Sequence, residues 1–171
     1  VKIVMKIIPD GQKKVYSNAE PQFLDSKLVS QPTAALQLVV KEVARCIELV
    51  SGNLKELIAV SREGDSEKIK EVIRNSEDTR KLYERITEYL SELFASGGLT
   101  EDQATQTADI MYILSDVDRM SALCREVCLS LKDKEEKKYK YSKDAMRDMQ
   151  HSLHLIQEMF TKAVQMMVSG N

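Results

Sequence analysis

The sequence contains few of the residues that a β-sheet protein uses at its turns. Its 171 residues include only 6 glycines and 3 prolines, whereas hairpins and crossover loops depend on such residues. These numbers argue against a β-sandwich and against a doubly wound sheet. Tryptophan is absent, aromatic residues make up 5% of the chain, and 43% of the residues are hydrophobic, with 8 methionines among them. This composition is typical of a helical bundle with an aliphatic core.

The sequence also lacks an excess of charge of one sign. It has 25 Lys and Arg residues against 27 Asp and Glu residues, a net charge of -2, whereas nucleic-acid binders normally carry a basic surplus. No run of about 18 apolar residues occurs, and residues 1–8 (VKIVMKII) are too short and too charged to span a bilayer. Three cysteines are an odd number for a disulfide framework. We therefore expect that the protein has no nucleic-acid partner. We also expect that it works in a reducing compartment.

Sequence signatures of common enzymes are missing as well. The chain has no glycine-rich phosphate loop, no serine between paired glycines and no paired-histidine zinc motif. No expected strand would hold such loops in place. We therefore expect neither enzymatic activity nor a cofactor.

Four long segments carry apolar residues at steps of three and four, which predicts four amphipathic helices. They span residues 32–62, 65–96, 100–131 and 142–167. Asp65 and Thr100 are candidate N-caps, and Thr100 forms a capping-box pattern with Gln103. The mixed-charge run at residues 132–138 is interpreted as a helix end or an inter-helix loop. The pattern predicts an all-α, antiparallel up-down bundle.

The chain divides into two parts by this pattern. Residues 1–31 are expected to form an apolar stub followed by an extended linker, because Pro9, Gly11, Pro21 and Pro32 interrupt the periodicity. Residues 32–171 form the helical bundle. We expect the linker to be the segment that proteases cut most easily, since it lacks a helical apolar stripe.

Charged residues on the second and third helices form the main candidate site. Arg80 interrupts the apolar stripe of the second helix, while Asp109, Asp116 and Asp118 lie beside the stripe of the third. An arginine near a helix seam needs a carboxylate partner or must reach water. One interpretation is a structural ion pair of Arg80 with Asp118 or Asp116. The other is a polar groove that holds an anion or a metal.

Two further groups have metal-ligand spacing but simpler explanations. Cys124 and Cys128 are one helical turn apart, yet the neighbouring stripe residues are aliphatic, as is usual for buried thiols. His151, His154 and Glu158 fall within about 60° of one another on the fourth helix, on its outer face. An exposed histidine pair without supporting hydrogen bonds is usually solvated.

Two segments of the bundle resemble one repeat of the PhoU family of phosphate-signalling proteins. These are residues 72–78 (VIRNSED) on the second helix and residues 113–120 (ILSDVDRM) on the third. The family's third helix carries an Asp-apolar-Glu-Arg-Ile-Gly-Asp segment, which residues 116–122 match at their first four positions. The resemblance covers residues 33–131 and implies one PhoU-like three-helix repeat followed by a fourth long helix.

The opening of the chain is similar to the join between the membrane part and the PhoU-like tail of bacterial sodium/phosphate cotransporters of the type II-related class. The features are the apolar stub that ends at Pro9, then residues 21–25 (PQFLD) and residues 32–36 (PTAAL). This resemblance implies a non-catalytic regulatory domain of an integral membrane protein, on the cytoplasmic side of the plasma membrane. Its partners would be the transporter's own membrane domain and a second copy of the chain.

The PhoU resemblance also implies a rival, which is a stand-alone, metal-binding regulator of phosphate signalling with Asp109, Asp116 and Asp118 as ligands. PhoU proteins hold metal clusters with acidic pairs spaced four apart on the second and third helices. The matching positions here are Ser76 and Arg80, and Asp118 and Ala122. Because three of the four lack a carboxylate and Arg80 is cationic, we expect no metal cluster.

Overall fold

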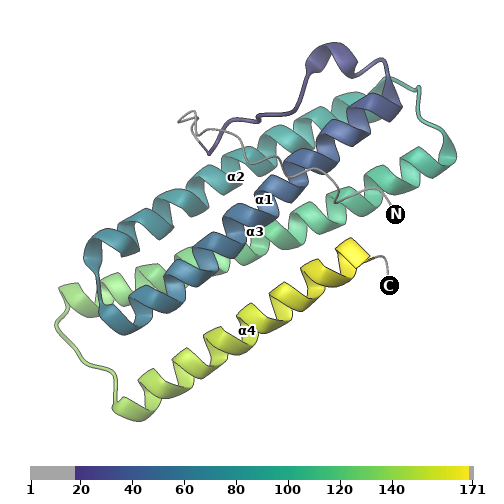
Figure 1. The fold of residues 1–171 in the computed structure, drawn as a ribbon. Coiled ribbons are helices and arrows are strands. Elements are labelled where there is room, and N and C mark those ends of the chain that lie inside the picture. Colours follow the sequence, from purple (N-terminus) through teal and green to yellow (C-terminus); the bar gives the residue numbers. More distant parts are fainter. Residues whose placement is uncertain (1–17, 170–171) are drawn as a thin grey trace, which may run out of the picture.

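The described part of the chain is entirely helical. The computed structural model describes residues 18–169, and within that range it contains no strand. The elements are a short 3-10 helix η1 (Ser26–Leu28) and the helices α1 (Pro32–Glu63), α2 (Ser66–Ala95), α3 (Glu101–Glu136) and α4 (Lys143–Ser169) (Figure 1). The prediction of an all-α bundle is confirmed. The apolar stub at residues 1–8 lies outside the described residues.

The helices begin and end where local sequence signals place them. The Asp65 carboxylate accepts hydrogen bonds from the backbone amides of Glu67 and Lys68 at the start of α2. Thr100 and Gln103 form both bonds of a capping box at the start of α3. Gly64 ends α1 in the left-handed region at φ 68°, where a residue without a Cβ is favoured. The mixed-charge run continues α3 to Glu136 before the chain leaves the helix.

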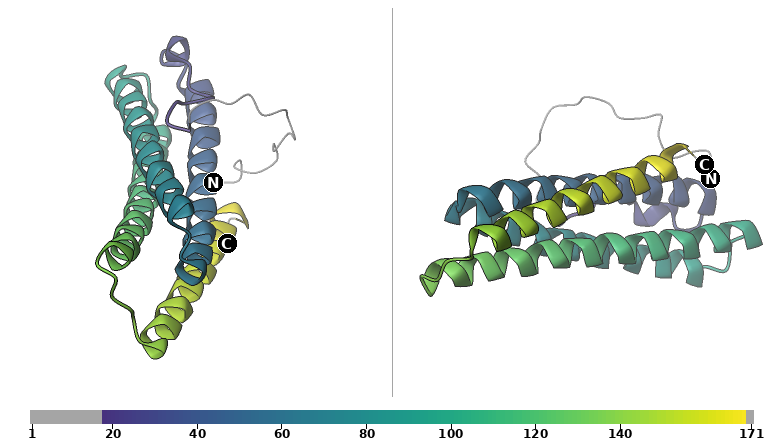
Figure 2. Two further views of the ribbon diagram at one scale, coloured as in Figure 1. Left: turned by 90° about the vertical axis from the view of Figure 1, so that its left-hand side faces the viewer. Right: turned by 90° about the horizontal axis from the view of Figure 1, so that it is seen from below.

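The first three helices pack against one another, and α4 is added to one side of this unit. Successive helices run in opposite directions, and α4 lies along α1 (Figures 1 and 2). Among the described residues of α4, Leu153 is the one buried hydrophobic side chain. Met149 and Phe160 are partly buried and pack against the same cluster. By contrast, Met159 and Met166 of α4 are 70% and 61% exposed. α4 therefore contributes less to the core than the other three helices do.

A layer of polar side chains divides the buried core into two hydrophobic clusters. One cluster includes Val50 and Leu82, and the other includes Leu54 and Val72. Between them the Asn53 amide donates to the Ser76 hydroxyl at 3.0 Å and to the backbone carbonyl of Val72. Thr79 and Ser121 are buried at the same level. Such layers favour one alignment of the helices, because a shift would leave buried polar groups without partners.

The segment before α1 is fastened to the bundle by side chains of α1 and α2. We name residues 18–31 the strap. Glu42, which is 0% exposed, accepts hydrogen bonds from the backbone amides of Gln22 and Phe23, both at 2.8 Å. Arg45 bonds to Glu42 and also donates to the backbone carbonyls of Asn18 and Glu20.

The strap thus differs from a freely extended linker. Its backbone amides are bonded to a buried carboxylate, and the Tyr89 hydroxyl of α2 donates to the carbonyl of Asp25 at 2.9 Å. Because a protease needs an extended, accessible backbone, we expect these bonds to slow cleavage at residues 20–25. Residues 26–28 form η1 and link the strap to α1.

Candidate functional site on α2 and α3

Arg80 lies on the outer face of the bundle, where α2 runs beside α3. Its guanidinium donates to Asp118 of α3 at 2.6 Å and to Glu84 of α2 at 3.1 Å. The guanidinium carbon also lies 5.3 Å from the centre of the Tyr83 ring. The hydrogen bond with Glu84, followed by the charge of Asp118, raises the pKa of Arg80 above its ordinary value. Arg80 therefore remains a cation bound by two carboxylates.

The helical repeat explains this arrangement. Arg80 and Glu84 are one turn apart and face the same way, and the antiparallel packing of α2 and α3 brings position 118 opposite position 80. The side chain of Arg80 is 58% exposed, whereas that of Asp118 is 14% exposed. Further along the contact between α2 and α3, Arg125 of α3 lies 3.9 Å from Glu77 of α2. Along this line between α2 and α3, Arg80 and Arg125 are therefore each paired with carboxylates.

The other residues named from the sequence do not join this site. Asp109 and Asp116 are exposed, and among the described residues neither forms an ion pair. Ser76 is 4% exposed and accepts a hydrogen bond from Asn53, so its hydroxyl serves the contact between α1 and α2. Ala122 is exposed and offers no ligand atom.

The residues at the four family positions do not fit a metal cluster. Asp118 is the one carboxylate among them, and the Arg80 guanidinium already binds it. A metal ion at this place would lie beside a fixed positive charge, which opposes binding. Within the described residues, no group of three or more His, Cys, Asp or Glu side chains is arranged to hold an ion.

The cysteines and histidines have different surroundings. Cys46, Cys124 and Cys128 are buried and unpaired by disulfides. Burial raises the pKa of the Cys46 and Cys128 thiols to about 12 and that of Cys124 to about 11, which keeps these side chains protonated. His151 and His154 are exposed on α4.

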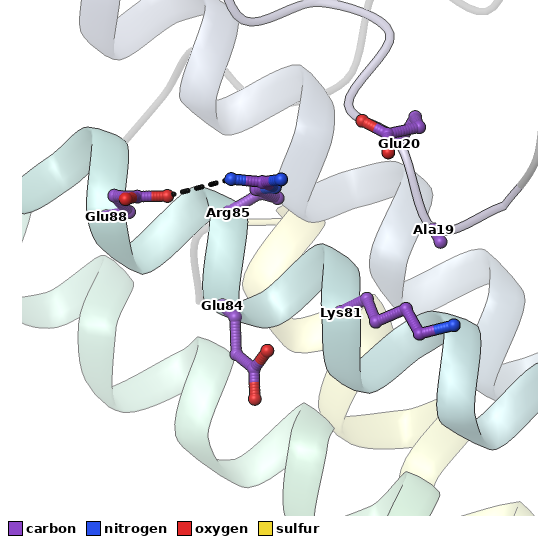
Figure 3. Close-up of a pocket in the computed structure, with 6 residues that line it drawn as sticks. All are labelled: Ala19, Glu20, Lys81, Glu84, Arg85 and Glu88. Atoms are coloured by element: carbon purple, nitrogen blue, oxygen red, sulfur yellow. Dashed lines mark hydrogen bonds and ion pairs between the residues drawn. The ribbon is translucent and has the colours of Figure 1, made fainter.

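A shallow cleft lies between the strap and α2. Its volume is about 340 Å³, and it is lined by Ala19, Glu20, Lys81, Glu84, Arg85 and Glu88. Figure 3 shows the strap residues on one side and the α2 side chains on the other, with Arg85 paired to Glu88. The lining mixes both charges, so the cleft selects neither an anion nor a cation.

The sequence analysis did not identify Glu42 and Arg45 of α1, which hold the strap together with Tyr89 of α2. Glu42 lies between Val39 and Val43 on the buried face of α1, where a carboxylate is unexpected. A charged residue in an apolar stripe needs a partner, and Arg45 one turn later was the available signal. The other partners of Glu42 are backbone amides about 20 residues away along the chain. No local sequence pattern identifies these amides.

The fold and the site together define a helical-bundle domain whose polar outer seam is closed by ion pairs. The model of the family described as PhoU domain matches residues 43–131, which is slightly more than half of the 171 residues. The chain belongs to the PhoU domain family. Searches of curated proteins and of solved structures found no match.

Proposed function

We propose that this chain is a non-catalytic regulatory domain of a sodium-dependent phosphate transporter, located on the cytoplasmic side of the plasma membrane. Membership of the PhoU family supports a regulatory role in phosphate handling. The transporter context is supported by the similarity of the opening segment to the join found in sodium/phosphate cotransporters. No helix within residues 18–169 is long and apolar enough to cross a bilayer, so the membrane part would be another segment of the same protein.

The observation that carries this proposal is the strap. Glu42 and Arg45 bind the backbone at residues 18–23, and Tyr89 binds it at Asp25. Any movement of a segment that precedes Asn18 would therefore be passed directly to α1 and α2. A domain that regulates an attached transporter needs such a firm mechanical connection. The bundle would then act through the outer faces of its helices, against the membrane domain or a second copy.

The rival function is a stand-alone metal-binding regulator. Its ligands would be Asp109, Asp116 and Asp118, but Arg80 binds Asp118 and the other two are separate exposed side chains. The two functions differ in where the protein is found and in what it binds.

The proposal is tested in the cells that make this protein, with an epitope tag fused to the full-length protein. We expect the tagged protein to stay in the membrane fraction after a high-salt wash. We also expect Tyr89→Phe, which removes one strap hydrogen bond at little cost to folding, to change sodium-dependent phosphate uptake at unchanged protein level. Tyr83→Phe is the matched control, because within the described residues the Tyr83 hydroxyl makes no hydrogen bond to the strap.

Two results would contradict the proposal. One is recovery of the tagged protein in the soluble fraction with bound metal, which would favour the rival. The other is phosphate uptake that is identical for Tyr89→Phe and Tyr83→Phe.

A further inference from the structure

The segment between α3 and α4 concentrates positive charge. We name residues 137–143 (KKYKYSK) the basic loop. It contains four lysines and two tyrosines and no acidic residue. Residues 137–140 are all exposed. The loop lies at the end of the bundle that also holds the turn between α1 and α2 (Figure 1).

The acidic side chains around the basic loop are already paired or directed elsewhere. Asp133 binds Lys137 at 2.7 Å, and Glu136 lies 3.7 Å from Lys132. At the start of α4, Asp144 binds Arg147 at 3.1 Å. The Glu135 carboxylate is turned towards Gly64, in the turn between α1 and α2.

Three lysines of the basic loop therefore keep an uncompensated charge. Lys138, Lys140 and Lys143 form no ion pair within the described residues. The chain as a whole has a net charge of -2, so this is a local concentration of positive charge on a nearly neutral molecule. A partner that recognises it must be anionic.

The backbone gives a separate reason to attribute a role to these side chains. Lys138 has a φ of 54°. Among the described residues it is the one residue other than glycine with a positive φ. This position follows the C-cap of α3, where glycine or asparagine normally relieves the clash of the Cβ. Packing does not require a lysine here, since Lys138 is exposed. A residue other than glycine at such a position is strained, and strained residues cluster at functional sites.

The tyrosines narrow the kind of anionic partner. Tyr139 is 43% exposed and stands edge-on to Tyr141, with 5.6 Å between the ring centres. Lys134 lies 5.5 Å from the centre of the Tyr141 ring. Lysine beside tyrosine is the combination found at membrane surfaces, where the ring enters the headgroup layer and the ammonium binds phosphate.

We propose that the basic loop binds an anionic lipid surface. The lysine ammonium groups bind the phosphates of lipid headgroups, and the Tyr139 ring inserts between them. The loop projects from one end of the bundle and does not form a long basic groove of the kind that follows a nucleic-acid strand. A stand-alone chain would bind the same surface, so this proposal does not depend on attachment to a transporter.

The test is sedimentation of the full chain with lipid vesicles at low salt. We expect it to bind vesicles of phosphatidylcholine mixed with phosphatidylglycerol, and not vesicles of phosphatidylcholine alone. Lys138, Lys140 and Lys143 changed together to Gln should reduce partitioning on the order of 100-fold, since each lysine near such a surface contributes about a fivefold effect. Tyr139→Ser should weaken binding by a smaller factor.

The control variant changes Lys41, Lys55 and Lys162 to Gln. These lysines are exposed and form no ion pair within the described residues, and the change in net charge is the same. We expect the control to bind as the unchanged chain does. Equal losses in the two triple variants would overturn the proposal, because the effect would then reflect net charge alone.

Two further results would also overturn it. One is release of the chain from vesicles by millimolar inorganic phosphate at constant ionic strength, which would point to a site for free phosphate. The other is tighter binding to single-stranded RNA than to the anionic vesicles. Circular dichroism of each variant confirms that the helices remain folded, so that lost binding reports on the loop.

Discussion

Arg80 changes the charge of the contact between α2 and α3. Its acidic neighbours alone would make this contact more negative. Arg80 places one positive charge between the carboxylates of Asp118 and Glu84, so it offsets part of their negative charge without any added cation. Because the Arg80 side chain is 58% exposed, water and salt screen the ion pair. We infer that Arg80 decides what the seam binds and contributes little to how stably the bundle folds.

Replacing Arg80 with Ala should lower the free energy of unfolding by less than about 1 kcal/mol, because exposed ion pairs contribute that little. Urea denaturation measures the change. A double-mutant cycle with Asp118→Asn should give a small favourable coupling, whereas the cycle with Asp116→Asn should give none. A loss of about 3 kcal/mol, as for a buried pair, or zero coupling to Asp118 would contradict this account.

The cysteines give a pH dependence whose sign follows from burial. Burial raises the pKa of Cys46 and Cys128 to about 12 and that of Cys124 to about 11, above the ordinary value of 9.0 for each. The folded state then holds these protons more tightly than the unfolded state does. Their contribution to stability is complete below pH 9 and is lost as the pH rises through 11 to 12.

We therefore expect the urea midpoint to fall as the pH rises above 9. Native protein at pH 8 should react with a thiol reagent only as fast as it unfolds. Replacing all three cysteines with Ala should flatten the pH dependence. Rapid labelling of any of them in the native state would show that the thiol is accessible and would contradict the described burial.

Ser121 provides a test of the polar layer. Its hydroxyl is buried and has no hydrogen-bond partner among the described residues, so Ser121→Ala should stabilise the protein by about 0.5 to 1 kcal/mol. Ser76→Ala is the matched change at the same level. It should destabilise, because it leaves the Asn53 amide without its 3.0 Å partner. Thermal or urea unfolding that gives both changes the same sign would contradict this view of the layer.

Among the elements of the fold, the strap depends on one buried carboxylate. Glu42→Ala should lower the free energy of unfolding by about 3 kcal/mol, because it strands the Arg45 charge and two backbone amides. Hydrogen exchange should accelerate at the amides of Gln22 and Phe23, and proteolysis should begin within the strap. Glu48→Ala, on the exposed face of α1, is the control. Unchanged exchange at Gln22 and Phe23 would show that Glu42 does not hold the strap.

The helices could be predicted from the sequence, whereas the strap could not. Helix ends depend on neighbours within a turn, as at Asp65 and at Thr100 with Gln103, so a local pattern is enough. The strap depends on bonds from Glu42 to amides 19 and 20 residues away. Only the folded chain brings these groups together.

The candidate site was predicted in part. The sequence indicated that Arg80 needs a carboxylate but left Asp116 and Asp118 open. The choice depends on how α2 and α3 are rotated about their axes, and the packed structure brings Asp118 within 2.6 Å of Arg80. The role of Ser76 was hidden for the same reason, since its partner Asn53 lies on another helix.

At the scale of the whole molecule, three helices form the stable unit, and α4 is joined to it mainly through α1. The apolar stripe of α4 predicted the helix and also its inward face, since Met149, Leu153 and Phe160 pack against the core while His151 and His154 are exposed. The strap and α4 both contact α1. The basic loop, between α3 and α4, lies where the fourth helix turns back towards the unit (Figure 2).

We infer that this member of the PhoU family holds no metal cluster and acts through its protein surfaces. Elemental analysis of the full chain, purified without chelator and then incubated with iron and zinc salts and desalted, tests it most directly. We expect far less than one tightly held ion per chain, because the Arg80 guanidinium already binds the Asp118 carboxylate. One or more iron or zinc ions per chain, retained through desalting, would contradict it and favour the metal-binding regulator.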